Sequence, residues 1–117
     1  PRVTAVLLKS QRQGIVFVSV YMPYYDRSFD QQAEYDLTVG CLQSLVDSNL
    51  GCLFVVGGDF NVERSTGTIA CQALSQFCSR NQLLWLEPKN NSIGFTFHND
   101  ASRHCSLIDH FLFSVSC

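Results

Sequence analysis

Hydrophobic residues repeat with two different periods along this chain, and segments of the two kinds alternate. Residues 3–8, VTAVLL, and residues 14–22, GIVFVSVYM, are rich in β-branched side chains and flank a polar, glycine-containing turn, which predicts two antiparallel strands. Residues 28–51 instead carry apolar side chains three and four positions apart, which predicts a helix. Strands that alternate with helices predict an α/β fold with a layered sheet.

Two helices are predicted, each with one apolar face. Ser28 followed by Gln31 fits a capping box, and Gly51 fits the left-handed position after the last turn. The face predicted for the first helix consists of Leu37, Cys41, Leu42, Leu45 and Val46. The second helix, within residues 68–82, is predicted to bury Ile69, Ala73, Leu74, Phe77 and Cys78.

The remaining apolar segments predict further strands. Residues 52–58, CLFVVGG, form a short continuous apolar run of the kind that is covered on both faces of a sheet. Residues 83–88 predict a brief extended piece. Residues 94–97 and 105–114 predict two strands joined by a turn at 98–104.

Composition places the chain among globular domains. With 117 residues, of which 46% are hydrophobic and 15% charged, it is one domain at most, or part of one. No apolar run reaches the ~18 residues that a membrane-spanning helix needs, so no membrane partner is expected. No basic leader precedes an apolar stretch, and we therefore expect an intracellular, nuclear or cytoplasmic, protein. The net charge of −2 disfavours nucleic-acid binding by bulk charge and leaves a local basic patch open.

The six cysteines do not predict a disulfide framework. They contain no C-x-x-C pair and lie mostly among aliphatic neighbours, which favours reduced, largely buried thiols in a reducing compartment over a disulfide or metal role. The three histidines also lack metal-ligand spacing. His98 and His104 are predicted to be solvated in a turn, and His110 to be a packing or rim residue.

Residues 55–65, VVGGDFNVERS, pass directly from an apolar run into an acid and an amide. If the strand continues through Asn61, Asp59 and Asn61 point to one side and Phe60 to the other. A carboxylate beside a neutral amide suits a hard cation together with an oxyanion. The alternative is a turn in which Asp and Asn make only local hydrogen bonds. The stretch alone leaves both interpretations open.

Two further polar residues lie on predicted strands. Tyr21 falls at the end of its strand, immediately before Met22 and Pro23, so either it packs at the rim with its hydroxyl in water or it serves a site there. Asp109 alternates with Leu107 and Phe111 on one face, where a carboxylate is costly unless it has a partner.

Four ordered stretches resemble motifs of the endonuclease/exonuclease/phosphatase superfamily. GGDFNV resembles its G-D-F-N motif, and VSVYMP resembles its strand that ends in Tyr-x-Pro. FTF and SLIDHFLFS are similar to its aromatic-Thr-aromatic strand and to its later strand that carries an aspartate. This family of metal-dependent phosphodiesterases includes apurinic DNA-repair endonucleases, deoxyribonuclease I and the endonucleases of non-LTR retrotransposons, to which VSVYMPYYD and SLIDHFLFS are most similar.

The resemblance implies a layered α/β sandwich with mixed, largely antiparallel sheets, like that of deoxyribonuclease I. It implies that Tyr21 binds the scissile phosphate, that Asp59 handles the proton of the attacking water or of the leaving oxygen, and that Asn61 stabilises charge on phosphorus. Asp109 would orient a catalytic histidine. Mg²⁺, or Mn²⁺ in its place, would be held by Asp59 and Asn61. Tyr24 stands where DNA-repair members have Asn, which disfavours an abasic-site repair role.

The resemblance also implies missing parts. The family's main metal-binding Glu would precede Pro1 and its Ser-Asp-His run would follow Cys117, so residues 1–117 are expected to be the central-to-C-terminal portion of one domain, incomplete at both ends. The substrate implied is DNA, with a reverse transcriptase domain in the same parent polypeptide, and the isolated chain is expected to be inactive. The alternatives are another superfamily phosphoesterase, acting on phosphoinositide, sphingomyelin or RNA 3′ ends, and a degenerate, non-catalytic binding or scaffold copy.

Overall fold

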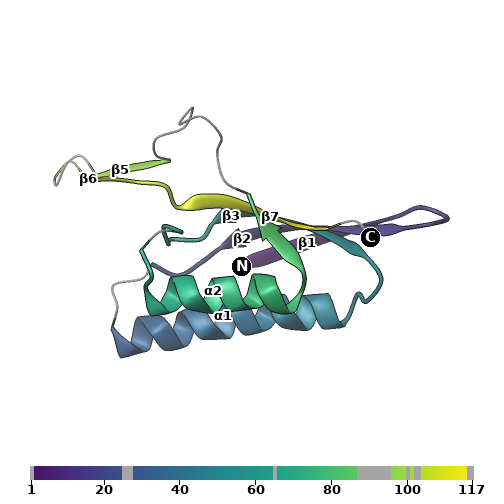
Figure 1. Cartoon of the computed structure of the whole chain (residues 1–117), viewed down its shortest axis with the longest axis horizontal. Coiled ribbons are helices and arrows are strands. Elements are labelled where there is room, and N and C mark those ends of the chain that lie inside the picture. Colours follow the sequence, from purple (N-terminus) through teal and green to yellow (C-terminus); the bar gives the residue numbers. More distant parts are fainter. Residues whose placement is uncertain are drawn as a thin grey trace.

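The fold is a mixed α/β arrangement with one main sheet (Figure 1). The computed structural model describes residues 2–24, 28–64, 66–86, 96–99, 101 and 104–115. In chain order the elements are β1 (Val3–Lys9), β2 (Gly14–Tyr21), α1 (Phe29–Asp47), β3 (Leu53–Asp59), α2 (Ile69–Arg80), β4 (Leu83–Trp85), β5 (Phe97–Asn99), β6 (His104–Ser106) and β7 (Asp109–Ser114). The predicted fold class is confirmed.

The main sheet has the strand order β1-β2-β3-β7-β4. Strand β2 pairs with β3 in parallel, and the other pairs are antiparallel, so the sheet is mixed and largely antiparallel. A parallel pair needs a crossover connection, which α1 provides between β2 and β3. Strands β5 and β6 form a separate two-stranded sheet that extends beyond the end of the main one (Figure 1).

Side-chain caps begin both helices. The Ser28 hydroxyl accepts a hydrogen bond from the Gln31 backbone N–H at 3.2 Å, which is one half of the predicted capping box. The reciprocal half is not formed among the described residues, because the Gln31 side-chain oxygen has no hydrogen-bond partner there. The Thr68 hydroxyl does the same for Cys71 N–H at 3.2 Å at the start of α2. Gly51 has the predicted left-handed φ of +85°, although it lies in the turn that follows α1 rather than in the helix cap.

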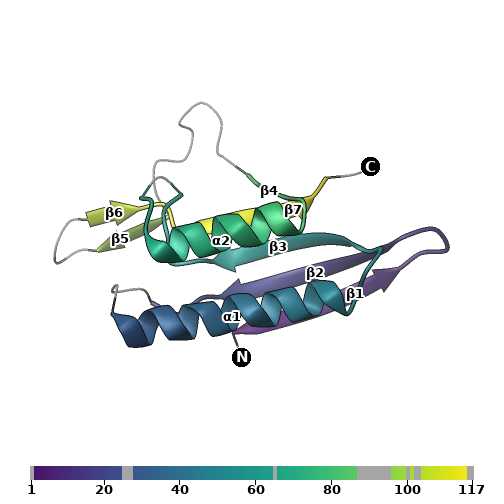
Figure 2. The same cartoon turned by 60° about the horizontal axis from the view of Figure 1, so that its bottom comes forward.

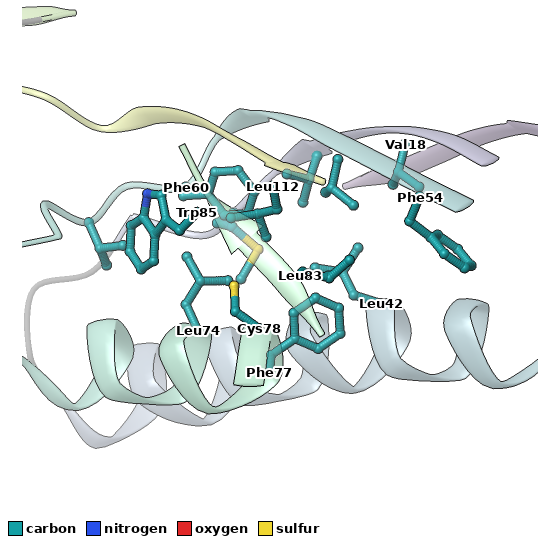
Figure 3. Close-up of a cluster of buried hydrophobic side chains, with 14 of the residues drawn as sticks. Val18, Leu42, Phe54, Phe60, Leu74, Phe77, Cys78, Leu83, Trp85 and Leu112 are labelled. Atoms are coloured by element: carbon teal, nitrogen blue, oxygen red, sulfur yellow. The ribbon is translucent and has the colours of Figure 1, made fainter. Parts of the chain in front are cut away.

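Both helices pack on the same face of the main sheet (Figure 2), which we call the helix-covered face. Every second residue of each central strand points toward the helices. The resulting core is one cluster formed by residues of β2, β3, β4, β7 and both helices (Figure 3). Its fully buried members include Val16, Val56, Leu112, Leu74, Leu42 and Phe60.

The predicted helix faces are partly wrong. Leu37 and Ile69 are 72% and 62% exposed, and Cys41 is exposed as well. The predicted Leu42 is buried, and the core side of α1 also carries Tyr35 and Thr38, which were not predicted. The two hydroxyls can be buried because each donates to a backbone carbonyl: Thr38 to Glu34 at 3.0 Å and Tyr35 to Phe60 at 2.9 Å. A pattern of apolar residues cannot detect polar side chains that are satisfied in this way.

The opposite face of the sheet is open, and the predicted cover on both faces of β3 is therefore wrong for the described ranges. In these ranges both helices lie on the other side (Figure 1). Three apolar side chains of the open face, Val6, Phe17 and Phe111, are 56%, 42% and 55% exposed. Together with Val55 they line a shallow cavity of about 440 Å³.

Two predicted elements differ in extent. The strand expected at 105–114 is divided into β6 and β7 by Leu107 and Ile108. Strand β5 begins at Phe97, and Gly94 and Phe95 of the predicted strand lie outside the described residues. None of the helices in the described ranges is both long and apolar enough to cross a membrane.

The thiols are free where they are described: Cys71 and Cys78 are buried, Cys52 is half-buried and Cys41 is exposed. The side chains of Cys105 and Cys117 lie outside the described part. The prediction that His110 is a packing residue is confirmed, since it is 6% exposed.

Candidate active site

Three of the four predicted site residues lie side by side on adjacent strands. Tyr21 of β2 is the register partner of Asp59 of β3, and Asp59 is the register partner of Asp109 of β7. Directly paired residues point to the same face, with Cβ atoms roughly 4.5–5.5 Å apart. Because Val20 and His110, the neighbours of Tyr21 and Asp109, are buried under the helices, all three side chains lie on the open face. Tyr21 is 59% exposed, Asp109 is exposed and Asp59 is half-buried.

Asn61 lies at the same end of the sheet, but it is in the loop that follows β3 and not in a strand. Strand β3 ends at Asp59, and Asn61 has a left-handed backbone with φ of 52°, so the predicted strand alternation through Asn61 is wrong. Its backbone N–H donates to Asp59 Oδ1 at 2.9 Å, and its side-chain Nδ2 donates to the Met22 carbonyl at 2.8 Å. The local hydrogen bond expected of a turn is therefore present, and it joins the Asp59 carboxylate to the backbone N–H of Asn61.

The two glycines before Asp59 have distinct roles. Gly58 has φ of +142°, and a Cβ there would lie 2.0 Å from the Val20 carbonyl oxygen, so β2 and β3 approach too closely for any other residue. At Gly57 a Cβ would lie 2.5 Å from the Phe111 ring, which packs across the glycine. The close approach at Gly58 sets Asp59 next to Tyr21.

The environment of Asp59 increases the affinity of its carboxylate for a proton. Burial raises the pKa of its carboxyl, and the neighbouring carboxylate of Asp109 adds to the rise, while the hydrogen bond from the Asn61 N–H opposes it. A carboxylate with a raised pKa is a better proton acceptor at neutral pH than an ordinary aspartate. Asp109 is exposed to water, so the free-energy cost of burying a carboxylate without a partner does not arise.

Three supporting residues were missed by the sequence reasoning. The Thr96 hydroxyl accepts hydrogen bonds from the N–H groups of Ile108 and Asp109, at 3.1 and 3.2 Å, and so fixes the start of β7. Glu63 Oε1 accepts from Leu107 N–H at 2.9 Å. Tyr35 binds the Phe60 carbonyl. Only Thr96 had a sequence signal, since it is the central residue of FTF.

Two arginines lie near the site. The Arg2 guanidinium is 5.7 Å from the centre of the Tyr21 ring, donates to the Tyr21 carbonyl at 3.3 Å and pairs with Glu34 at 2.8 Å. Arg64 lies 5.6 Å from the centre of the Trp85 ring. Both positive groups are positioned by an aromatic ring, which limits their range of motion.

A cavity of about 360 Å³ opens beside Asp109. Most of its wall is apolar, and it provides room next to the carboxylates for part of a ligand. It is lined by Gly58, Leu86, Thr96, Leu107, Asp109, His110 and Phe111.

The donor atoms at this end of the sheet are hard oxygens. Asp59 and Asp109 contribute carboxylates and Asn61 an amide oxygen, which suits Mg²⁺ or Mn²⁺. Among the described residues, no group of three or more His, Cys, Asp or Glu side chains could hold a metal ion. Magnesium is usually bound by one or two carboxylates with water and substrate phosphate. The residues present therefore fit a metal that binds together with its substrate, and do not form a closed cage.

Comparison with known proteins gives matches in structure alone. No protein-family model matches the sequence, and no curated protein matches it. The solved structures that are similar to this chain include the following three. The endonuclease domain of TRAS1, a telomere-specific non-LTR retrotransposon, has a TM-score of 0.69 and 14% identity over 97% of this chain and 50% of that domain. An endonuclease/exonuclease/phosphatase family protein from Leptotrichia buccalis has a TM-score of 0.62 and 15% identity over 97% of this chain and 41% of that chain. A beta toxin from Staphylococcus aureus has a TM-score of 0.61 and 11% identity over 96% of this chain and 42% of that chain.

These matches show the fold. The chain has the mixed α/β arrangement of endonuclease/exonuclease/phosphatase-type, deoxyribonuclease I-like structures, and it spans about half the length of the solved chains that it matches.

Proposed function

We propose that this chain carries part of the catalytic surface of a metal-dependent phosphodiesterase, and that the substrate is a DNA phosphodiester. The observation that supports this proposal most strongly is the row formed by Tyr21, Asp59 and Asp109 on one face of three adjacent strands, joined to Asn61 by a hydrogen bond. Residues from three separate parts of the sequence meet at one end of the sheet. Each is of a type that phosphodiester hydrolysis uses.

Each side chain has a role that its environment supports. Asp59 accepts a proton from the attacking water. Asn61 and the Tyr21 hydroxyl are hydrogen-bonding groups for the phosphate oxygens, and Tyr21 is exposed enough to reach a large substrate. Asp109 orients a histidine supplied by a segment outside this chain. Magnesium held by Asp59 and Asn61 would neutralise the negative charge that develops on the phosphate.

The proposal of DNA as the substrate rests on the fold likeness to a retrotransposon endonuclease domain. The parent polypeptide would then be a retroelement protein that also carries a reverse transcriptase domain and acts in the nucleus or cytoplasm. No specific observation favours a phosphoinositide, sphingomyelin or RNA substrate. The hydrogen bonds that hold Asp59 and Asn61 argue against a decayed, non-catalytic copy.

Nicking of supercoiled plasmid in Mg²⁺ tests the proposal. The bare chain is expected to show no nicking above the level of its Asp59→Ala variant, because part of the catalytic set lies outside it. In a longer polypeptide that contains this chain, Asp59→Asn is expected to reduce nicking by roughly a hundredfold or more. Asp47→Asn at the end of α1 is the matched control for charge, and is expected to nick at the wild-type rate. Equal nicking by the Asp59→Asn and Asp47→Asn polypeptides would refute the proposed role.

Metal binding has a test of its own on the bare chain. Paramagnetic Mn²⁺ is expected to broaden the amide NMR signals of residues near Asp59 in the wild type and not in Asp59→Asn. Uniform broadening in both proteins would contradict the metal assignment.

A further inference from the structure

We propose that Tyr35 and His110 are positioning residues of this site: they bind the backbone on both sides of Asn61 from within the core and so fix the conformation of that residue. The relevance of this arrangement to phosphate chemistry rests on the function proposed above. The pair of hydrogen bonds from Tyr35 and His110, which we call the clamp, does not depend on that function. We call the segment Phe60–Val62 the site loop.

The first half of the clamp comes from α1. Tyr35 is 0% exposed, and its hydroxyl donates to the Phe60 carbonyl at 2.9 Å. Phe60 is the residue between Asp59 and Asn61, so this bond holds the peptide that joins the two predicted site residues. A buried hydroxyl without a partner would be costly, and the hydrogen bond therefore ties the position of the site loop to the packing of α1.

The second half comes from β7. His110 is 6% exposed, and its Nε2 lies 2.7 Å from the Val62 carbonyl oxygen. Since a carbonyl can only accept, Nε2 carries the hydrogen. The imidazole is held edge-on to Trp85, with ring centres 4.9 Å apart at 73°, and it also contacts the Phe60 ring at 6.0 Å. The donor therefore occupies a fixed place in the core.

The conformation between these two bonds needs such support. Asn61 adopts a left-handed backbone with φ of 52°, a region that non-glycine residues populate sparsely, although asparagine enters it more readily than most. The Phe60 N–H also donates to the Ile108 carbonyl at 2.8 Å. The carbonyls of Phe60 and Val62 and the Phe60 N–H are thus bound by groups outside the site loop, and the conformation of Asn61 persists because its neighbours on both sides are held.

The functional consequence is an oriented amide. With its backbone fixed, Asn61 can donate from Nδ2 to the Met22 carbonyl at 2.8 Å, which sets the direction of the side-chain amide and leaves Oδ1 as an acceptor for a cation. If the clamp loosens, Asn61 is expected to sample ordinary backbone conformations, and the amide then loses this direction.

Tyr35→Phe tests the first bond, because it keeps the ring in the core and removes only the hydroxyl. In amide NMR the variant is expected to show a changed three-bond coupling between the Asn61 N–H and its α-proton, which reports φ. Hydrogen exchange of the Asn61 N–H is expected to accelerate roughly three- to tenfold. The matched control is Thr38→Val. It removes a buried hydroxyl one turn away on the same helix face, where the bond goes to Glu34 of the helix itself, and it is expected to leave both readouts unchanged.

The second bond has a rescue test. His110→Phe keeps an aromatic ring against Trp85 and removes the donor, so it is expected to change the Asn61 coupling in the same direction as Tyr35→Phe. His110→Gln can place an amide N–H near the former Nε2 and is expected to restore the wild-type coupling. A general loss of packing would not be rescued by a residue smaller than the ring that it replaces.

The outcomes separate the two proposals. An Asn61 coupling that stays wild-type in both Tyr35→Phe and His110→Phe would overturn the clamp, whatever the protein binds. An equal change in Thr38→Val would also overturn it, because the effect would then follow from helix packing. Titration with inorganic phosphate and Mn²⁺ tests the site separately. Wild-type signals of Asp59 and Asn61 that do not respond would count against the proposed function, while the variant couplings would still decide the clamp.

Discussion

The two faces of the main sheet are built from the same strands and differ in almost every other respect. On the helix-covered face Val18, Val56 and Leu112 are at most 5% exposed. On the open face Phe17 and Phe111, which lie next to them in sequence, are 42% and 55% exposed. One face therefore supplies the core, and the other combines accessible apolar side chains with the candidate active site. Whether a strand residue contributes to the core or to the candidate site depends on which face of the sheet its side chain points to, and this face alternates from one residue to the next.

The faces are nevertheless connected. Tyr35 and His110 belong to the core, and their polar atoms hold the site loop at the end of the sheet. The open face can thus carry exposed polar groups in a fixed arrangement because the covered face holds their backbone.

The largest expected difference between the faces is in stability. Leu112→Ala, at a position that is 0% exposed, is expected to lower the free energy of unfolding by about 3–4 kcal/mol, since it leaves a cavity in the core. Phe111→Ala, one residue away and 55% exposed, is expected to cost about 1 kcal/mol or less. Urea denaturation followed by circular dichroism measures both. Similar losses would mean that the open face is buried in solution.

The two glycines of β3 give the next contrast. Gly58→Ala is expected to destabilise the protein by about 2–3 kcal/mol, because its Cβ would lie 2.0 Å from a strand carbonyl and the backbone has φ of +142°. Gly57→Ala meets the Phe111 ring, a side chain that can move on the open face, and is expected to cost clearly less. Thermal unfolding of the two variants ranks them. A more severe effect at Gly57 would contradict the proposed strand contact at Gly58.

A smaller effect of opposite sign is expected at the site itself. The folded-state pKa of Asp59 lies above the usual 3.8, so the native state binds the proton more tightly and stability falls as the pH rises through the window above 3.8. Asp59→Asn keeps the acceptor for the Asn61 N–H and removes the charge. Its melting temperature at neutral pH is expected to exceed that of the wild type by roughly 1–3 °C. The gain should vanish below pH 3.8, and a gain that is independent of pH would exclude ionisation as its cause.

The smallest effect belongs to the covered face. Burial lowers the pKa of His110 below 6.5, and the hydrogen bond to Val62 opposes this shift. The unfolded chain then binds the proton more readily, so the stability that neutral His110 provides is present above pH 6.5 and declines as the pH falls below it. The melting temperature of the wild type is expected to drop by roughly 1–2 °C across this window, relative to His110→Gln. Parallel pH profiles of the two proteins would contradict this assignment.

The sequence was informative where the physics is local. The β-branched runs predicted β1 and β2, and Ser28 capped α1 as expected, because period and caps depend on near neighbours. The helix faces were harder to predict, since burial of Tyr35 and Thr38 depends on distant or intrahelical carbonyls that hydropathy does not include.

The candidate site shows the same limit. Proximity of Tyr21, Asp59 and Asp109 followed from recognisable motifs, whereas the register that pairs them is a property of the whole sheet. The left-handed turn at Asn61 could not be predicted from strand alternation, because it depends on a glycine-assisted close approach before it and on core donors around it. The catalytic roles of the four residues remain predictions.

The parallel register of β2 and β3 makes this fold intolerant of one kind of sequence change. Loss of a single residue within Leu53–Asp59 would either pull the site loop out of place or turn the strand over, with Asp59 pointing toward the helices and the core residues Phe54 and Val56 in water. The hairpin turn around Gln11 and Arg12, at the far end of β2, has no such constraint. Length variation should therefore be accepted at one end of the sheet and rejected at the other.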